Sequence, residues 1–440
     1  MGWCALPLVL ACSGTGHGKE PRAPGPAAPP IAEALLAGAT ELATAEYVWF
    51  HQHPELANQE RETAARLATT LEGLGLEVHS GIGGHGIVAL LQGQKPGTGP
   101  TVLYRADMDG LRVSEQTKLP HPSLNPGVMH ACGHDVHMAT AVGVLRVMAE
   151  TRRDWSGTIV FVGQPAEEIG AGARQMLADP AFGRLLDRVG KPRVAFALHD
   201  AADVPAGQVA VSAGYVSATV DSVDMTLHGR GGHGAKPDQT VDPIVMASEV
   251  VLQLQTIVSR RITPGKRAVV TVGKLQAGES HNVIPASAEL LLTVRSYEPE
   301  VRKLLLEEIE HIARHVAQSY HAPRPPTITV RAEPTPAGFN DEGWSRRLAA
   351  RFTALLGPGR VVDAPPSMGG DDFARFSLKL GIPSVYYRLG AVDAAAFARR
   401  DREPLPSLHS DQWAPDARTA LPIGIATMVA ALREGLSAED

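Results

Sequence analysis

The densest group of chemically versatile side chains lies at residues 129–137, which read MHACGHDVH. It contains Cys132 and His134, and Cys132 is the only cysteine outside the first twelve residues. Thiolate, imidazole and carboxylate groups all bind divalent transition metals. The segment forms a Gly-containing loop ahead of an expected helix at Ala139–Glu150, where α/β enzymes place their sites. It is therefore a candidate metal site, with a histidine-rich surface turn as the alternative.

Two adjacent carboxylates form a second candidate. Glu167 and Glu168 follow Gln-Pro-Ala, directly after the apolar strand expected at Gly157–Val162. On a turn the two side chains point in different directions, so one can bind a metal while the other faces a metal-activated water. That division is the chemistry of amide hydrolysis. The alternative is a solvated pair of acids at a helix start, where negative charge is favourable.

Two more histidines complete a possible ligand set. His199 ends the apolar strand expected at Val194–Leu198, and His409 lies in a polar loop near the C-terminus. Each is weak alone, because a single histidine at a strand end is more often structural. The four segments together supply one cysteine, three histidines and one glutamate, with a second glutamate to spare. Five ligands and a base suit a two-metal hydrolase.

A glycine-rich stretch and an asparagine stand apart from these segments. Residues 229–234 formally match G-x-G-x-x-G, but Pro237 and Pro243 interrupt before the next expected helix, which argues against dinucleotide binding. A turn presenting His233 to a neighbouring site, or a solvated loop histidine, fits equally well. Asn282 suits a substrate carbonyl or carboxylate, with ordinary turn chemistry as the alternative. The sequence contains neither a P-loop motif nor a G-x-S-x-G elbow.

The elements that must position these residues alternate between helix and strand. Apolar periodicity predicts an α/β domain with a largely parallel sheet. The expected elements are helices at 31–53, 61–74, 139–150 and 172–178, strands at 87–91, 101–104, 157–162 and 194–198, and near the C-terminus a strand at 384–387 and a helix at 418–432.

The pattern changes between Gly214 and Glu333. Its order is strand, helix, strand, strand, helix, strand, which is the ferredoxin-like plan. The sequence therefore predicts an α/β domain made of residues 31–213 and 334–440, with an α+β domain inserted at 214–333.

Composition excludes several functions. The 440 residues carry a formal net charge of −6, and no Lys/Arg-rich run appears, so a general nucleic-acid binder is not expected. No stretch approaches the ~20 apolar residues of a membrane span.

The first thirty residues read as a leader and tether. Val9-Leu10-Ala11-Cys12 resembles a bacterial lipobox, in which the cysteine becomes the lipidated N-terminus, and a Gly/Pro/Ala-rich tether follows to Pro30. We expect a lipoprotein of the periplasm or cell envelope, attached to the membrane only through this anchor. A frayed cytoplasmic N-terminus is the alternative.

These motifs together resemble those of one family. The chain is similar to the amidohydrolase branch of the dinuclear aminoacylase/carboxypeptidase metallopeptidase clan, which includes hippurate hydrolases, N-acyl-amino-acid amidohydrolases and plant auxin-conjugate hydrolases. The matching segments are YRADMDGL at 104–111, MHACGHD at 129–135, QPAEE at 164–168, GGHG at 231–234, DPI at 242–244, NVIP at 282–285 and GDDF at 370–373.

The resemblance implies roles for individual residues. The two metal ions, Mn or Zn with Co as a further option, would be bound by the five candidate ligands, and Glu167 would be the general base and then the proton donor. Asp107, Asp109 and Asp135 would support the ligands without binding metal. The implied ligands are Cys132, His134, Glu168, His199 and His409.

The inserted domain resembles the family's lid and dimerisation domain. In that family its histidine, here His233, can reach the active site of the partner subunit, and the asparagine matching Asn282 contacts substrate. The resemblance thus implies a homodimer formed through the inserted domain. Three departures from the family pattern, at Asp238, Asp371 and the residues after His409-Ser410, bear on substrate preference.

The expected function is hydrolysis of a hippurate-like N-acyl amino acid to a carboxylate and a free amino acid. A di- or carboxypeptidase of the same clan would share the metal chemistry and differ only in the pocket on the acyl side, so it remains an alternative. A non-catalytic, lipid-anchored binding protein is a third possibility. Glu167 beside a complete ligand set argues against it, because binding needs no base.

Overall fold

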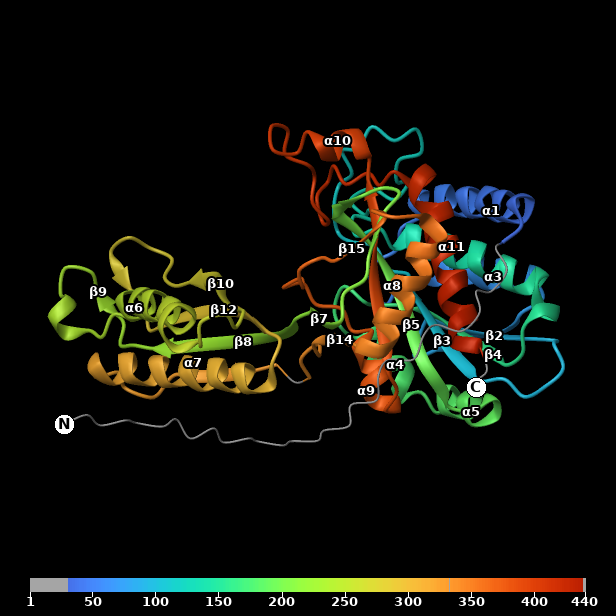
Figure 1. Ribbon diagram of the computed structural model, residues 1–440. Coiled ribbons are helices and arrows are strands. Elements are labelled where there is room, and N and C mark those ends of the chain that lie inside the picture. The colour runs from blue at the N-terminus through green and yellow to red at the C-terminus, as the bar shows by residue number, and fades with distance from the viewer. Residues whose placement is uncertain (1–30, 332, 438–440) are drawn as a thin grey trace, which may run out of the picture.

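A computed structural model describes residues 31–331 and 333–437 of the chain. The expected lipobox and tether lie outside the described residues. The chain forms a large domain from which a smaller, elongated lid domain projects (Figure 1).

The large domain is built on an eight-stranded sheet in the order β1-β2-β4-β3-β5-β16-β6-β15. Its central strands β4, β3, β5 and β16 run parallel, whereas β1, β2 and the β16–β6 pair are antiparallel. The sheet is therefore mixed, with a parallel centre. The strands are β1 (Glu77–Ile82), β2 (Gly86–Gln92), β3 (Thr101–Asp107), β4 (Thr158–Gln164), β5 (Pro192–Pro205), β6 (Val209–Ala210), β15 (Val361–Val362) and β16 (Ser384–Val392).

Helices cover both faces of this sheet. Side chains of β3 alternate between the two cores: Val102 and Tyr104 face one, and Leu103 faces the other. The first core lies under α1 (Glu33–Gln52), α2 (Arg61–Gly73), α3 (His134–Glu150), α8 (Glu342–Leu356) and α11 (Ala417–Leu436). The second lies under α4 (Gly172–Ala178), α5 (Pro180–Val189) and α9 (Ala374–Leu380).

Helix α11 is long and apolar enough to cross a membrane by length and composition, contrary to the expectation that no stretch would be. In the structure 72% of its most apolar window is buried, and it packs against α1, α3 and the sheet. It is the central core helix of the large domain.

The lid is a four-stranded antiparallel sheet in the order β10-β12-β8-β13, with two helices packed on it. This is the strand order of a ferredoxin-like fold, and the element order is the predicted one. The elements are β8 (Thr219–His228), α6 (Pro243–Thr256), β10 (Ala268–Gln276), β12 (Ser287–Ser296), α7 (Pro299–Ser319) and β13 (Thr327–Val330).

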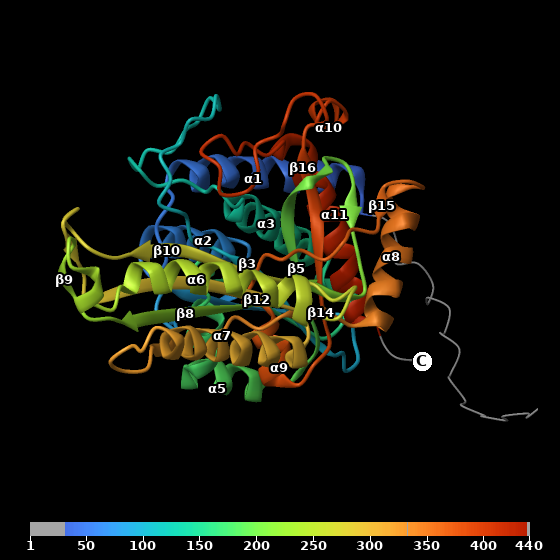
Figure 2. The same cartoon turned by 90° about the vertical axis from the view of Figure 1, so that its left-hand side faces the viewer.

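Short elements mark the two ends of the lid. Strands β7 (Gly214–Ser217) and β14 (Gly338–Asn340) pair at the junction with the large domain. Strands β9 (Gly232–His233) and β11 (Val283–Ile284) pair at the distal end (Figure 2).

The predicted start of one helix is wrong in a way that matters for the site. Helix α3 begins at His134, five residues before the predicted Ala139. All but three of its seventeen residues are buried, so it lacks the polar face that would have shown a helical period in its first turn. The consequence is that His134, Asp135 and His137 belong to the first turn of a helix and not to a loop.

Candidate active site

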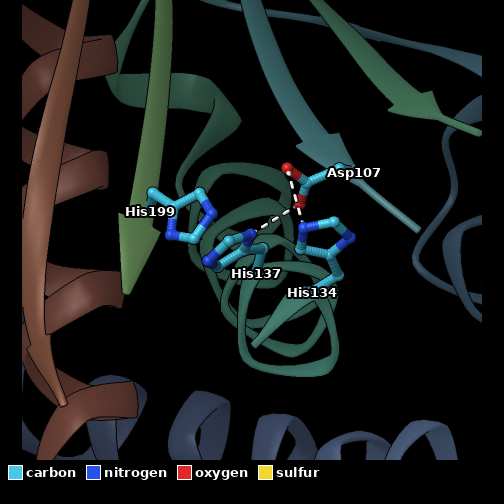
Figure 3. A group of neighbouring side chains, drawn as sticks. All are labelled: Asp107, His134, His137 and His199. Atoms are coloured by element: carbon cyan, nitrogen blue, oxygen red, sulfur yellow. Dashed lines mark hydrogen bonds and ion pairs between the residues drawn. The ribbon is translucent and has the colours of Figure 1, made fainter. Parts of the chain in front are cut away.

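The candidate site lies where the parallel strands end. Asp107 is the last residue of β3, His199 lies on β5, and His134 opens α3; Figure 3 shows these side chains converging. Glu167 and Glu168 come just after β4, the neighbour of β3. Chain segments far apart in sequence therefore meet at the C-terminal ends of the parallel strands, the usual site position in α/β folds.

The turn before α3 requires glycine. Gly133 has φ 78°, in the left-handed region, and a Cβ there would lie 2.0 Å from a carboxylate oxygen of Asp200. This turn lets α3 start at once, so that His134 and His137 lie one helical turn apart on the same side.

All five predicted metal ligands are brought together. Donor atoms of Cys132, His134 and Glu168 lie within 4.8 Å of one another. The Cys132 Sγ is 3.6 Å from His199 Nε2 and 3.2 Å from His409 Nε2, and the latter is 3.5 Å from a Glu168 oxygen. The five donors form one cluster.

The histidines present their free nitrogens to this cluster. His134 donates its Nδ1 proton to the Asp109 carbonyl at 2.8 Å, and His199 donates its own to the Asp200 carbonyl at 2.7 Å. Each Nε2 is thereby left with a lone pair, the form that binds metal. His134 Nε2 and Glu168 Oε1 are buried and lack any hydrogen-bond partner in the described part of the chain. Such orphaned buried atoms fit divalent ions held by this donor set.

His137 belongs to the site but was given no role from the sequence. Its Nδ1 donates to Asp107 at 2.5 Å, and its Nε2 accepts the backbone N–H of Asp200 at 2.9 Å. Both ring nitrogens are occupied, so His137 orients Asp107 and is not a free ligand. The sequence feature that indicates a role for His137 is the His-x-x-His spacing of residues 134–137. This spacing places both side chains on one side only if the helix already begins at His134.

The turn carrying the two glutamates is held by buried carboxylates that accept its backbone N–H groups. The Asp109 carboxylate accepts the backbone N–H groups of Glu167 and Glu168, each at 3.0 Å. Ala166, with φ 51°, donates its N–H to Glu60 at 2.7 Å. Glu60 is fully buried, and burial raises its pKa to about 7. Asp109 thus occupies the supporting position expected of it, whereas Glu60 was missed.

Glu167 lies between the ligand cluster and a second acidic group. One of its oxygens is 3.9 Å from His134 Nε2, and its carboxylate lies within 4.8 Å of those of Asp371 and Asp372. Burial raises the pKa of Glu167 well above its usual value, and the charge of Asp371 adds to this. A carboxylate that binds protons this readily is suited to take and return one.

Arg105 connects the ligand cluster with the acidic group formed by Asp371 and Asp372, and its role is not evident from the sequence. This fully buried side chain donates to Asp107 at 2.6 Å and to Asp371 at 2.9 Å. It also donates to Gln164 at 2.8 Å. One guanidinium therefore compensates carboxylates on both sides of Glu167. Asp107 has its pKa held well below the usual value despite burial, because of Arg105 and the neighbouring histidines.

Asp135 supports the site from another direction. Its carboxylate lies 2.6 Å from His51 Nδ1, and the other nitrogen of His51 lies 3.3 Å from Glu115. Asp135 therefore ties the start of α3 to helix α1 and, through His51, to the loop between Leu111 and Met129.

His233 and Asn282 are not brought to this cluster within the chain. They lie side by side at the distal end of the lid, where β9 pairs with β11 and the Gly234 N–H donates to the Asn282 carbonyl at 2.8 Å. The lid projects away from the large domain, so this end is remote from the ligands (Figure 1).

A cleft of about 810 Å³ separates the ligand cluster from the base of the lid. The large domain contributes Cys132, Glu167, His199 and His409 to its lining, and the lid contributes Arg295 of β12. The Arg295 guanidinium donates to the Met368 carbonyl at 2.9 Å. Only burial shifts its pKa, downward, because no carboxylate of the described chain lies against it.

Comparison with known proteins shows the family of this chain. The sequence matches the peptidase family M20/M25/M40 over residues 103–407, and the chain belongs to this family. It is 36% identical over 341 residues to N-acetylcysteine deacetylase of Bacillus subtilis (77% of this chain, 86% of the relative). It is 34% identical over 345 residues to thermostable carboxypeptidase 1 of Saccharolobus solfataricus (77% and 83%).

A solved structure shows the same fold. The Bacillus subtilis YXEP protein, a dinuclear metal-binding peptidase of the M20 family, superposes with a TM-score of 0.72 at 30% identity, covering 90% of this chain and 97% of that one. Family, fold and donor set together make this chain a metal-dependent hydrolase that acts on amide bonds.

Proposed function

We propose that the chain hydrolyses N-acyl amino acids to a carboxylate and a free amino acid. The observation that carries the proposal is Glu167, buried beside a complete set of metal ligands and held on a turn that two other carboxylates fix. Similarity to a relative named N-acetylcysteine deacetylase supports an acyl amino acid as the substrate, and a carboxypeptidase of comparable identity keeps a peptide as the alternative.

Two divalent ions, Mn or Zn with Co as a further option, would be held by the cluster. When bound, they would lower the pKa of the attacking water and polarise the scissile carbonyl. The five residues that would hold them are Cys132, His134, Glu168, His199 and His409.

The remaining steps fall to other residues of the chain. Glu167 takes the proton of the attacking water and returns it to the leaving amine. Because its pKa is raised, the protonated form is readily reached once the water is consumed. Arg105 keeps the neighbouring carboxylates in place through this transfer of charge.

The free carboxylate of the substrate pairs with Arg295 in this proposal. This cation lines the cleft on the lid side, opposite the ligands, and lacks a carboxylate partner in the described chain. A substrate that spans the cleft would place its acyl group at the ligand cluster and its carboxylate toward the lid.

We further propose that a second copy of the chain completes the site through its lid. His233 accepts the Ala235 N–H on Nδ1 at 3.0 Å, so its proton lies on Nε2, ready to be donated to a substrate oxygen. Apolar side chains stand exposed on α6, and β10 is an edge strand of the lid sheet, which suits pairing with another lid. These side chains are Ile244, Val245 and Leu252.

Mixing two inactive variants tests the shared site. Glu167→Gln and His233→Ala subunits, each inactive alone, should recover roughly a quarter of wild-type activity when mixed, since half of the mixed dimers' sites are intact. No recovery, although differently tagged subunits co-purify as mixed dimers, would contradict a site shared between subunits.

A substrate panel tests the chemistry. Chelator-stripped protein starting at Ile31 is supplied with Mn, Zn or Co and assayed for amino-acid release from hippurate, N-acetyl amino acids and dipeptides. Metal-dependent release that favours the acyl amino acids supports the proposal. Preference for dipeptides would favour the carboxypeptidase alternative, and tight metal binding without turnover would favour a binding protein.

We also propose that Cys12 is lipidated and anchors the protein in the cell envelope. The support is the Leu-Ala-Cys sequence followed by a Gly/Pro-rich tether. Labelled palmitate should enter the wild-type protein and not the Cys12→Ser variant; equal labelling, or none in either, would contradict the anchor.

A further inference from the structure

Two consecutive tyrosines of β16 point to opposite faces of the sheet. Tyr387 is fully buried against α11, where its hydroxyl lies 2.9 Å from the Thr427 Oγ1. Tyr386 faces the other way, is partly buried and lines the active-site cleft. The side-chain alternation of a strand thus gives one tyrosine to the core and the other to the site.

The Tyr386 ring lies between the metal ligands and the acidic group around Glu167. Its centroid is 6.0 Å from that of His199 and 6.3 Å from that of Phe373, the residue after Asp372. Glu167, Asp371 and His199 line the same cleft. The ring therefore borders the part of the cleft that a scissile bond would occupy if Glu167 activates the water.

The backbone of Tyr386 is held firmly. Its N–H donates to Asn340 Oδ1, and its carbonyl accepts from Asn340 Nδ2, both at 2.8 Å. These two bonds come in addition to the pairing of β16 with β5. A side chain carried by such a rigid backbone segment loses little conformational entropy when it binds a substrate.

The hydroxyl of Tyr386 has no hydrogen-bond partner within residues 31–331 and 333–437, unlike that of Tyr387. The ordinary pKa of a tyrosine hydroxyl is about 10, well above neutral pH. The phenol consequently keeps its proton and is a free donor. Several carboxylates lie on this side of the cleft and would repel negative charge on a substrate. A neutral hydrogen-bond donor at this position would stabilise such charge.

We propose that the Tyr386 hydroxyl donates a hydrogen bond to the oxyanion that develops on the scissile carbonyl. The proton stays on tyrosine throughout, so the group stabilises charge and transfers nothing. The inference rests on the proposed hydrolysis of N-acyl amino acids. It adds a donor from within the same chain, independent of the His233 of a second copy.

Tyr386→Phe tests the inference, because it removes one oxygen atom and keeps the ring. With Mn-loaded protein and the best N-acyl amino acid, we expect kcat to fall roughly 100-fold with KM changed less than about threefold, as for loss of one oxyanion donor. Affinity for a phosphonate analogue of that substrate, measured by calorimetry, should weaken by a similar factor. Bound metal and the melting temperature should not change.

Tyr387→Phe is the matched control, since it removes the neighbouring hydroxyl from the core. It should lower the melting temperature by roughly a few degrees through the lost bond to Thr427, with kcat unchanged. If Tyr386→Phe kept kcat within twofold of an active wild type, or raised only KM, the inference would be overturned while the hydrolase stood. A wild-type protein that neither turned over the panel nor bound the phosphonate would overturn the proposed function itself.

Discussion

The ligand cluster of the large domain and the distal end of the lid both present histidines, in opposite ways. His134 is fully buried, donates its Nδ1 proton to a backbone carbonyl and directs its Nε2 toward Cys132 and Glu168. His233 is exposed and held by one backbone N–H. The first region is organised within a single chain. In our proposal, the distal end of the lid takes part in catalysis only when it binds to a second copy of the chain.

An arginine of the large domain and an arginine of the lid differ in the same way. Arg105 is buried and bonded to carboxylates from β3 and from the loop before α9. Arg331, at the base of the lid, is 59% exposed, and its guanidinium pairs with Asp224 at 3.1 Å. A buried charge network fixes geometry but depends on every member, whereas an exposed pair contributes little and can be lost. The following predictions test that contrast, from the largest expected effect to the smallest.

Replacing the base should have the largest effect. We expect Glu167→Gln to lower kcat by a factor on the order of 10³ to 10⁴, because it removes proton transfer while retaining the shape of the side chain. Metal content, measured by mass spectrometry, should equal that of the wild type. Glu62→Gln, an exposed glutamate on α2, is the control and should leave both unchanged. Near wild-type turnover of Glu167→Gln would show that another group is the base.

Arg105→Met should destabilise the large domain severely. The variant leaves Asp107 and Asp371 buried without their cation, and breaking a buried pair typically costs about 3–5 kcal/mol. Urea denaturation of the metal-free protein measures the free energy of unfolding. An unaltered midpoint would mean that the buried carboxylates do not depend on this arginine.

Glu60 should make stability depend on pH. Its folded pKa of about 7 exceeds the ordinary 4.5, so the stability it contributes is complete below pH 4.5 and lost as pH rises through 7. Relative to Glu60→Gln, the metal-free wild type should therefore lose roughly 3 kcal/mol of unfolding free energy between pH 4.5 and 7. Parallel pH profiles of the two proteins would contradict a buried carboxyl at this position.

Arg331→Met should have the smallest effect. An exposed ion pair contributes less than about 1 kcal/mol, so the unfolding free energy should stay within that range of the wild type. Destabilisation equal to that of Arg105→Met would erase the distinction between the two regions.

The same contrast explains what the sequence could predict. The five candidate ligands could be predicted because the Cys-Gly-His and Glu-Glu motifs indicate metal chemistry, and because His199 and His409 complete the set in the family that the chain resembles. The lid could be predicted because its element order specifies one strand order. The supports could not be found this way. Arg105 and Asp371 are 266 positions apart, and Glu60 reaches Ala166 across 106 positions. Nothing local in the sequence indicates such a pair, because only the assembled sheet brings the partners together.

Helix α3 and Tyr386 illustrate the remaining limits. The start of α3 was hidden because its first turn is buried on all sides and carries polar residues. Tyr386 and Tyr387 are indistinguishable as neighbours in an apolar strand. Only the direction of each side chain, fixed by the register of β16 against β5, separates a core residue from one in the cleft.

Metal titration of chelator-stripped protein tests the central claim most directly. Amino-acid release from an N-acyl amino acid should be absent without metal, rise with added Mn and saturate at about two ions per chain. Glu167→Gln should bind the same amount of metal and release amino acid at least about a thousandfold more slowly. Undiminished release by the metal-free protein, or no release with both ions bound, would contradict a metal-dependent hydrolase that uses Glu167 as its base.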